Sequence, residues 1–506
     1  MGNSDIEAAR VFHEITKHSY TSVRSSAHYL DWDIKPLPYK IYPDAAAIAL
    51  PRDFELSAMP TLRAIAGEAA PFSAESIGLE SLTRLLFCGG GLTHRSRVGG
   101  EDYHFRAAAS AGALYPIEIY VAAGEIDGLQ AGLYHFSPAD LKLRGLRRGD
   151  WRRTIARAAA MRPSLASARA VLLMTAIYWR SAWKYRARAY RYCFWDAGTI
   201  AANLLAAGSA GQVPAEIVTA FVDSELEALL GIDSRREGLA CLVALGRSET
   251  EPAEPPALEP FPFEAIALSS REVTYDDLVK IHAESRLKSR EEVEAVTSAR
   301  IETRALPAPG SQLRFETIDP DHSSPLGATI LRRGSTRVFA EAPISREELA
   351  TIMADSSAHP RSDFPRLTST YLIVNGVEGM EPGAYYYRRE NGSFELLKRG
   401  NFRADAGYLC LEQPLGMKCS ALVVYAANLD SALGALGNRA YRDMHLEAGI
   451  LAGRAYLAAY SLGRGATGLT FYDDDTTKFF EPHAAGMSPL LMVALGVPRS
   501  AAEDQT

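Results

Sequence analysis

The sequence predicts an α+β protein made of two similar modules, each with a central, mostly antiparallel sheet and flanking helices. Three observations support this prediction: an internal repeat, the same order of strands and helices in both copies, and an acidic, proline-rich stretch between them. The chain has 506 residues, of which 47% are hydrophobic and 23% are charged. This length is sufficient for two or more domains with full cores.

The internal repeat shows as a constant spacing between matching segments. GLQAGLYHF at 128–136 matches GMEPGAYYY at 379–387, and RAYRYCFWDAG at 188–198 matches RAYRDMHLEAG at 439–449, both with a shift of 251 residues. A constant shift over roughly 70 residues is hard to obtain by chance, so it indicates an internal duplication.

Each copy follows the same order of elements. After a helix come two strands joined by a turn, an apolar strand, a long helix and a last strand, as the apolar patterns indicate. The predicted ranges are 117–123, 132–136, 170–179, 190–211 and 241–246 in the first copy, and 369–376, 383–387, 421–428, 441–463 and 491–496 in the second.

A linker separates the two copies. Residues 248–263, SETEPAEPPALEPFPF, are acidic and rich in proline, between stretches of good apolar periodicity. We therefore expect an N-terminal extension at 1–50, a first domain at 51–247, the linker at 248–263 and a second domain at 264–506.

Composition excludes several classes of protein. The net charge is −7 and no long basic stripe occurs, which argues against nucleic acid or an anionic membrane as the main partner. The longest apolar segments are too short to cross a bilayer, and the N-terminus has no apolar signal core, so we expect a cytoplasmic protein. Five scattered cysteines without a C-x-x-C pair fit a reducing compartment.

Several segments carry a resemblance to a known family. In the first copy these are 105–121 (FRAAASAGALYPIEIYV), 128–150 and 181–211, together with the N-terminal 12–42; in the second copy the resemblance runs through 330–353 (ILRRGSTRVFAEAPISREELATIM). They resemble the nitroreductase-like flavoproteins. The first copy resembles in particular the azoline dehydrogenases that act in the biosynthesis of thiazole- and oxazole-containing peptides.

The resemblance implies a cofactor and a place for it. Such proteins bind FMN non-covalently at a dimer interface, with an arginine-rich turn from one subunit and a Ser-Ala-Gly segment from its partner. Here each copy has one of the two parts. RRGSTRVF at 332–339 aligns with IAGEAAPF at 65–72, and SAGALYP at 110–116 aligns with RSDFPRL at 361–367.

We therefore predict an intramolecular pseudo-dimer with one FMN per chain. The arginine turn of the second copy would meet Ser110, Ala111 and Gly112 of the first. In the other pocket Glu68 would stand where a phosphate should lie, and an anion there is repelled.

The arginine turn suits a phosphate. Guanidinium groups and a hydroxyl offer charge-assisted hydrogen bonds to phosphate oxygens, so Arg332, Arg333 and Ser335 are candidate ligands, and Arg337 could reach the pyrimidine edge of the flavin. The alternative is a solvated basic turn that opens a helix.

Small residues complete the predicted site. Ser110, Ala111 and Gly112 allow the backbone to approach a planar ring closely, although an ordinary tight turn before the next strand has the same composition. The resemblance places Gly468, Leu469 and Thr470 where a backbone amide faces the flavin. Arg499 is a further phosphate candidate, and its alternative is an exposed terminal charge.

Lys184 and Tyr185 are the predicted catalytic residues. They resemble the Lys-Tyr pair that azoline dehydrogenases place over the flavin, and oxidation of an azoline requires a base for the proton that leaves carbon. The alternative is a surface lysine and a packed tyrosine. The family has glycine after the pair, whereas this chain has Arg186, which leaves the substrate open.

Other matched residues have a structural interpretation. Arg188, Tyr190 and Arg191 recur in the second copy as Arg439, Tyr441 and Arg442, so we expect them at the domain interface. Asp196 and Glu447 are also matched and are not predicted to be catalytic. The eleven histidines show no ligand spacing, and no metal is expected.

Three functions are compatible with these features. The first is an FMN-dependent oxidoreductase that oxidises thiazoline or oxazoline rings in a peptide or related small molecule to azoles, with dioxygen as acceptor and separate cyclodehydratase proteins as partners. The second is an NAD(P)H-dependent nitroreductase or quinone reductase. The third is a flavin-binding or flavin-free scaffold in a biosynthetic complex.

Overall fold

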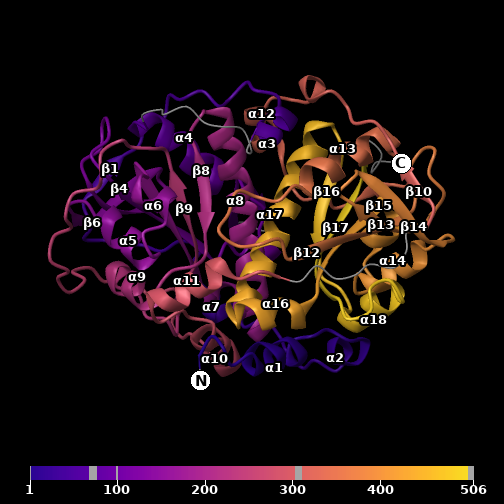
Figure 1. Ribbon diagram of the computed structural model, residues 1–506, viewed down its shortest axis with the longest axis horizontal. Coiled ribbons are helices and arrows are strands. Elements are labelled where there is room, and N and C mark those ends of the chain that lie inside the picture. The colour runs from indigo at the N-terminus through magenta and orange to yellow at the C-terminus, as the bar shows by residue number, and fades with distance from the viewer. Residues whose placement is uncertain (1, 68–76, 99–100, 302–309, 500–506) are drawn as a thin grey trace.

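The computed structural model describes residues 2–67, 77–98, 101–301 and 310–499. Figure 1 shows two lobes side by side, the first half of the chain in indigo and magenta and the second in orange and yellow. Each lobe combines a sheet with helices, so the predicted two-module α+β architecture is confirmed.

The two sheets have equivalent strand orders. The first is β1-β6-β5-β4-β7-β9-β8, and the second is β10-β14-β13-β12-β15-β17-β11, with β16 also paired to β17. All the neighbouring strands described in them are antiparallel. Strands β2 and β3 form a separate hairpin. The bounds are β1 Ala47–Ala49, β2 Leu92–Val98, β3 Glu101–Arg106, β4 Ile117–Ala123, β5 Gly132–Ser137, β6 Lys142–Arg148, β7 Ala170–Ile177, β8 Ala215–Val218, β9 Glu237–Leu245, β10 Gln312–Arg314, β11 Phe339–Ala340, β12 Thr368–Val374, β13 Gly383–Arg388, β14 Ser393–Arg399, β15 Ala421–Ala427, β16 Gly465–Leu469 and β17 Ser488–Pro498.

Helices cover the sheets and fill the space between the lobes. They are α1 Glu7–Ile15, α2 Tyr20–Arg24, α3 Thr61–Ala66, α4 Leu79–Gly90, α5 Arg152–Ala158, α6 Pro163–Ala166, α7 Tyr178–Tyr185, α8 Ala189–Ala210, α9 Asp223–Leu230, α10 Asp276–Glu284, α11 Arg290–Ser298, α12 Leu326–Arg332, α13 Arg346–Ser356, α14 Arg403–Leu409, α15 Pro414–Lys418, α16 Leu429–Leu436, α17 Arg439–Ser461 and α18 Asp473–Phe479, with short 3-10 turns at Trp32–Ile34, Ala111–Ala113, Arg186–Arg188 and Pro320–His322.

The central strands of both sheets are apolar and are buried on both faces. β4, β7 and β9 are buried along their whole length, and so is β15 in the second sheet. Their continuous apolar runs are the pattern of strands buried on both faces. The predicted strand at 170–179 ends two residues earlier, at Ile177, because Tyr178 begins α7.

The long helices α8 and α17 lie against each other at the centre of the molecule (Figure 1). Their backbones touch at equivalent glycines. A Cβ atom on Gly198 would lie 2.6 Å from Cα of Gly449, and one on Gly449 would lie 2.4 Å from the carbonyl oxygen of Trp195. Contact between equivalent residues is the property of a two-fold interface, so the two copies pack as a pseudo-dimer.

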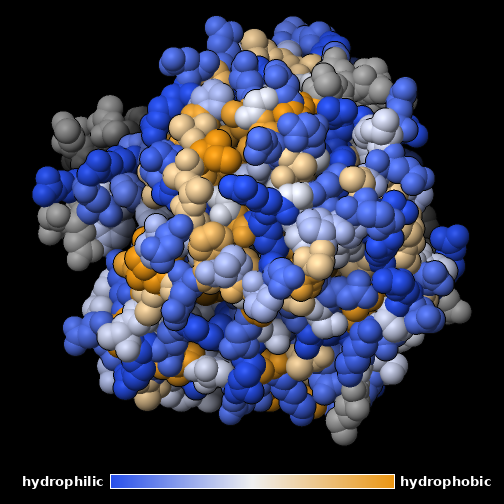
Figure 2. All heavy atoms as spheres, turned by 90° about the vertical axis from the view of Figure 1, so that its left-hand side faces the viewer, coloured by the Kyte–Doolittle hydropathy of each residue, from blue (hydrophilic) through white to orange (hydrophobic). Residues whose placement is uncertain are grey.

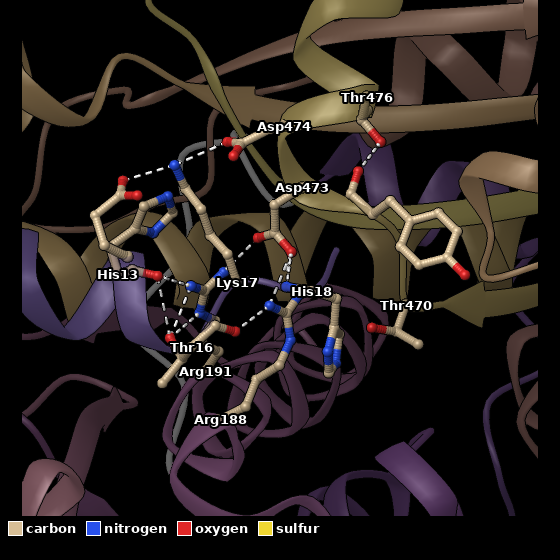
Figure 3. Close-up of polar contacts among 12 residues, drawn as sticks. His13, Thr16, Lys17, His18, Arg188, Arg191, Thr470, Asp473, Asp474 and Thr476 are labelled. Carbon is tan, nitrogen blue, oxygen red and sulfur yellow. Dashed lines mark hydrogen bonds and ion pairs between the residues drawn. The ribbon is translucent and has the colours of Figure 1, made fainter. Parts of the chain in front are cut away.

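Two buried arginine–aspartate clusters join the copies in equivalent ways. Arg188 and Arg191 of the first copy donate to Asp473 of the second at 2.9 and 2.8 Å (Figure 3). Arg439 and Arg442 of the second copy donate to Asp223 of the first, at 2.5 and 2.8 Å. All six side chains are almost wholly buried, which confirms the predicted interface role of these arginines.

The clusters also reveal a matched pair of helices that the sequence prediction missed. Arg191 donates to the carbonyl of His13 and the hydroxyl of Thr16, at the end of α1. Arg442 makes the same two contacts with His282 and Ser285, at the end of α10. The helix inside the N-terminal extension therefore has a counterpart at the start of the second copy.

The linker follows the surface of the first copy without regular secondary structure. Arg147 donates to the carbonyl of Glu259, and the ring of Phe261 packs against Tyr42. Figure 2 shows the outer side of this copy as a mostly hydrophilic surface with hydrophobic residues in small groups, as on a face in contact with water. In the described part of the chain, every helix is too short or too polar to cross a bilayer.

Candidate functional site

A cavity of about 780 Å³ lies between the two copies. Its walls come from the β2–β3 hairpin, the segment before β4, the end of α7 and the face of α8 in the first copy. The second copy contributes the turn after α12, part of α17 and strand β16. All the predicted site residues except Arg499 line this cavity: Ser110, Ala111, Gly112, Lys184, Tyr185, Arg332, Arg333, Ser335, Arg337, Gly468, Leu469 and Thr470.

Arg499 lies beside the site without lining it. The residue follows β17, and its backbone N–H donates to the carbonyl of Val338 at 3.1 Å, one residue beyond Arg337. It is exposed. Its role as a phosphate ligand stays a prediction.

The arginine turn follows a helix instead of opening one. Arg332 is the last residue of α12, so the carbonyl end of the helix points here, and an anion gains nothing from the helix dipole. Arg333 donates to the carbonyls of Arg106, Ala107 and Gly334 at 2.6, 2.9 and 3.2 Å. These bonds tie the turn to the first copy and leave two of the five guanidinium N–H donors for a ligand.

The cavity is strongly basic. Lys184, Arg332, Arg333 and Arg337 line it, and Asp196 is the one carboxylate among the lining residues. In the described part of the chain, Arg337 has no hydrogen bond or ion pair, and it is exposed. Cations drawn from both copies therefore face the same space, which suits an anionic ligand.

The Ser110–Gly112 segment is held by a buried carboxylate. The Ser110 hydroxyl and the Ala111 N–H donate to Asp196 at 2.5 and 2.9 Å, and the Tyr115 N–H donates to Ser110 Oγ at 2.9 Å. Gly112 has a φ of 64°, in the left-handed region that favours glycine. A Cβ there would lie 2.6 Å from Tyr185 Oη, so the turn must be bare at this point.

Lys184 and Tyr185 end α7 and converge on the same turn. Lys184 Nζ would lie 3.4 Å from a Cβ on Gly112, and it stands 5.4 Å from the centre of the Tyr185 ring. Burial and the nearby charge of Arg337 lower the pKa of Lys184. Burial, with Tyr192 and Asp196 close by, raises the pKa of Tyr185, so its phenol is neutral at pH 7.

The second copy completes the cavity with β16 and α17. Gly468 N–H donates to Tyr456 Oη at 2.5 Å, and Tyr456 Oη lies 3.3 Å from Ser335 Oγ. Tyr192 and Thr470 join the two copies through their hydroxyls at 3.2 Å. The predicted segment 468–470 is thus brought next to the arginine turn.

The β2–β3 hairpin is a wall that the sequence prediction missed. His94, Ser96 and Phe105 line the cavity from it. The first copy uses residues 91–116 to connect α4 to β4, whereas the second copy uses only 357–367 between α13 and β12. A signal was present in the sequence, because the shift between the copies is 267 at Phe72 and Phe339 but 251 further along.

The equivalent place in the other half of the molecule is filled by the chain itself. Asp363, which corresponds to Gly112, accepts hydrogen bonds from the N–H groups of Thr219 and Ala220 at 2.8 and 2.9 Å. Ile217 pairs with Ser362 in a short parallel bridge. Thr219 corresponds to Thr470, so the segment that lines the open cavity in one half binds Asp363 in the other. Glu68, predicted to oppose a phosphate here, lies outside the described residues.

Comparison with known proteins agrees with this architecture. The nitroreductase family model matches residues 71–247 and 330–497. A crystal structure of a protein from Anabaena variabilis, provisionally described as a nitroreductase, superposes with a TM-score of 0.78 at 26% identity, covering 97% of this chain and 99% of that one.

Two further relatives are more distant or shorter. A protein of Methanocaldococcus jannaschii, provisionally named a nitroreductase, is 28% identical over 176 residues, which are 35% of this chain and 84% of that protein. A chain of the E. coli microcin synthetase complex is 16% identical, and the match covers 48% of this chain and 93% of that chain. Its TM-score of 0.31 is too low to bear on the substrate. Because the family model matches most of the chain, in two copies, the protein belongs to the nitroreductase family.

Proposed function

We propose that the chain is an FMN-dependent oxidoreductase that holds one FMN in the cavity between its two copies. Its substrate is a thiazoline or oxazoline ring in a peptide or related small molecule, which it oxidises to the azole, with dioxygen as the final acceptor. The observation that carries this proposal is the meeting of Ser110–Gly112 from the first copy with Arg332–Arg337 from the second around one basic cavity.

The residues present fit FMN. A volume of about 780 Å³ lies in the range of sites for cofactors and small ligands. Arg337, the free donors of Arg333 and the hydroxyl of Ser335 would hold the phosphate and the pyrimidine edge, and Arg499 would assist from the rim. The small residues 110–112 and the backbone of 468–470 would face the ring.

The chain's own groups supply the proton chemistry. Conversion of an azoline to an azole removes two electrons and two protons, and FMN, when bound, supplies the two-electron acceptor together with the site for one hydrogen. Lys184 Nζ accepts the other proton from the substrate carbon, because its lowered pKa increases the neutral fraction. Tyr185, whose phenol is neutral at pH 7, donates a hydrogen bond to the ring nitrogen or oxygen and so orients the substrate.

A second candidate function is reduction of nitro compounds or quinones by NAD(P)H. It is favoured by the provisional names of the relatives from Anabaena variabilis and Methanocaldococcus jannaschii. In that case NAD(P)H would reduce the cofactor without any azoline.

Anaerobic mixing distinguishes the two functions. The FMN-loaded protein is mixed in a stopped-flow instrument either with a short peptide that carries one thiazoline or with NADPH, and flavin absorbance is followed. We expect bleaching by the peptide, a product two mass units lighter, and recovery of colour on admitting dioxygen. Bleaching by NADPH alone would support the second function, and a chain that takes up no FMN would contradict both.

The genetic context offers an independent check. Separate cyclodehydratase proteins would have to produce the azoline, so we expect genes for such an enzyme and for a short precursor rich in Cys, Ser and Thr beside this one.

A further inference from the structure

Asp196 is a buried acid in the wall of the cavity, and the proposed chemistry does not use it. It lies on α8 and is only 4% exposed. Its two oxygens accept hydrogen bonds from the Ser110 hydroxyl and the Ala111 N–H, which belong to the turn that faces the cavity. In the described part of the chain no cation forms an ion pair with it.

The equivalent residue is Glu447, in the half of the molecule where Asp363 binds two backbone amides, here called the closed half. The carboxylate of Glu447 has different partners. Glu447 accepts from the N–H of Leu367 at 2.9 Å and pairs with His359 at 3.2 Å. Burial would raise the pKa of Glu447, but His359, the Leu367 N–H and Arg366 together lower it. Burial raises the pKa of Asp196 to about 7, against the opposing hydrogen bonds of Ser110 and Ala111 and the charge of Arg106. The groups that face Asp196 are Arg106, Tyr115, Tyr185 and Cys193, and the cations Lys184, Arg333 and Arg337 line the same cavity.

The protonation state of Asp196 decides what Ser110 can do. A serine hydroxyl has one hydrogen to donate and two lone pairs to accept with. When Asp196 is ionised, the Ser110 hydrogen is committed to the carboxylate. When Asp196 is protonated, its O–H can donate to Ser110 Oγ, which also accepts from the Tyr115 N–H, and the serine hydrogen becomes free to point into the cavity.

We infer that Asp196 is a positioning residue of the cavity: it fixes the Ser110–Gly112 turn, and its protonation frees the Ser110 hydroxyl to donate to a bound ligand. For the identity of that ligand the inference rests on the proposed function. An anionic ligand such as FMN should bind more tightly to the protonated form, which adds a donor and removes a negative charge.

The test measures FMN affinity by fluorescence quenching from pH 5.5 to 9 in the parent, Asp196→Asn and Glu447→Gln. Above pH about 7 we expect the dissociation constant of the parent to rise, by up to tenfold per pH unit, relative to Asp196→Asn. Glu447→Gln, the matched substitution in the closed half, should keep the slope of the parent. Titration of the FMN phosphate is common to all three proteins and cancels in the ratios. Parallel curves for the parent and Asp196→Asn would overturn the inference.

Ser110→Ala separates the effect of the Ser110 hydrogen bond to the ligand from the effect of the negative charge of Asp196. This variant should bind FMN more weakly below pH 7, and its FMN dissociation constant should rise less steeply with pH. If the whole parental slope is kept, the part of the inference that concerns Ser110 is wrong.

Melting of the FMN-free protein tests Asp196 without any ligand. Because the folded pKa is raised, the parent should lose stability relative to Asp196→Asn as pH rises from about 4 to about 7. Failure to bind FMN would contradict the proposed function alone, whereas identical melting profiles would contradict the role of Asp196.

Discussion

The open cavity and the closed site lie at equivalent positions in the two copies of one fold. One is a cavity, and the other is filled by side chains of the protein itself. In the open half, the lack of a Cβ on Gly112 leaves room for the Tyr185 hydroxyl, and residues 468–470 line the cavity. In the closed half, the Asp363 carboxylate takes the amides of Thr219 and Ala220. The framework around both is nevertheless retained, including the Gly198–Gly449 contact. The interface is thus alike in the two copies, whereas the surroundings of Gly112 and Asp363 differ.

The largest expected effect comes from breaking the shared framework. Asp223→Ala and Asp473→Ala each leave two buried arginines without their anion, which should cost about 3–5 kcal/mol in the free energy of unfolding. Burial would raise the pKa of Asp223, but Arg439 and Arg442 lower it to about 2. This contribution is therefore present at neutral pH and lost as the pH falls from about 4 through about 2.

Urea unfolding at pH 7 measures both variants, with exposed Asp430→Ala as the control because its partner Arg10 also reaches solvent. Similar losses are expected in the two halves. A large loss for one aspartate and none for the other would contradict an equivalent framework.

Chemistry should depend on one half only. Lys184→Ala should keep FMN and lower the rate of flavin reduction by the azoline peptide about 10²–10⁴-fold, since a general base contributes about that factor. The equivalent position in the second copy already carries Ala435. Single-turnover stopped-flow decides this, and a variant that reduces its flavin at the parental rate would show that Lys184 is not the base.

Ligand binding should depend on the arginine turn. Arg337→Ala should weaken FMN about ten- to a hundredfold, equivalent to roughly 1.5–3 kcal/mol for a charge-assisted hydrogen bond. Arg337 has no other hydrogen bond or ion pair in the described structure, so melting of the FMN-free protein should not change. Arg333→Ala is a less specific test, because Arg333 also binds the carbonyls of Arg106 and Ala107. An unchanged FMN dissociation constant in Arg337→Ala would exclude this residue as a ligand.

Opening the closed site tests its loss directly. Asp363→Gly restores the residue of the open half and leaves the buried N–H groups of Thr219 and Ala220 without their acceptor, at a cost of about 1–3 kcal/mol. The acid-released flavin should still equal one FMN per chain, because the first copy lacks the arginine turn. A ratio that approaches two would show that Asp363 alone keeps the second site closed.

The sequence was sufficient for the two-module fold and for part of the cavity wall, namely the arginine turn, residues 110–112, Lys184, Tyr185 and residues 468–470. The 251-residue shift located equivalent strands and helices, and the arginine turn and the Ser110–Gly112 segment line the same cavity, as predicted. Interactions across the two copies could not be predicted. The change from Gly112 to Asp363 is visible in the sequence, but the two backbone amides that Asp363 binds belong to a segment 143 residues away. The bonds of Arg333 to Arg106 and Ala107 were hidden for the same reason, because they depend on how the copies dock.

The smallest expected effect concerns Arg186, the residue after Lys184 and Tyr185. It has φ 52° and ψ −142°, and its counterpart Gly437 has φ 68° and ψ −159°, so the two copies share a backbone conformation that suits glycine. For a residue with a Cβ this region costs about 1–3 kcal/mol. Arg186→Gly should therefore stabilise the protein by roughly 1 kcal/mol, once the greater freedom of glycine in the unfolded chain, worth about 0.5–1 kcal/mol, is subtracted. Urea unfolding of Arg186→Gly and Arg186→Ala separates relief of strain from loss of the side chain, because only glycine removes the Cβ. If Arg186→Gly is less stable than Arg186→Ala by the full ~0.5–1 kcal/mol that glycine costs through the unfolded chain, the conformation of Arg186 is not strained, and the copies differ at this position only in their side chains.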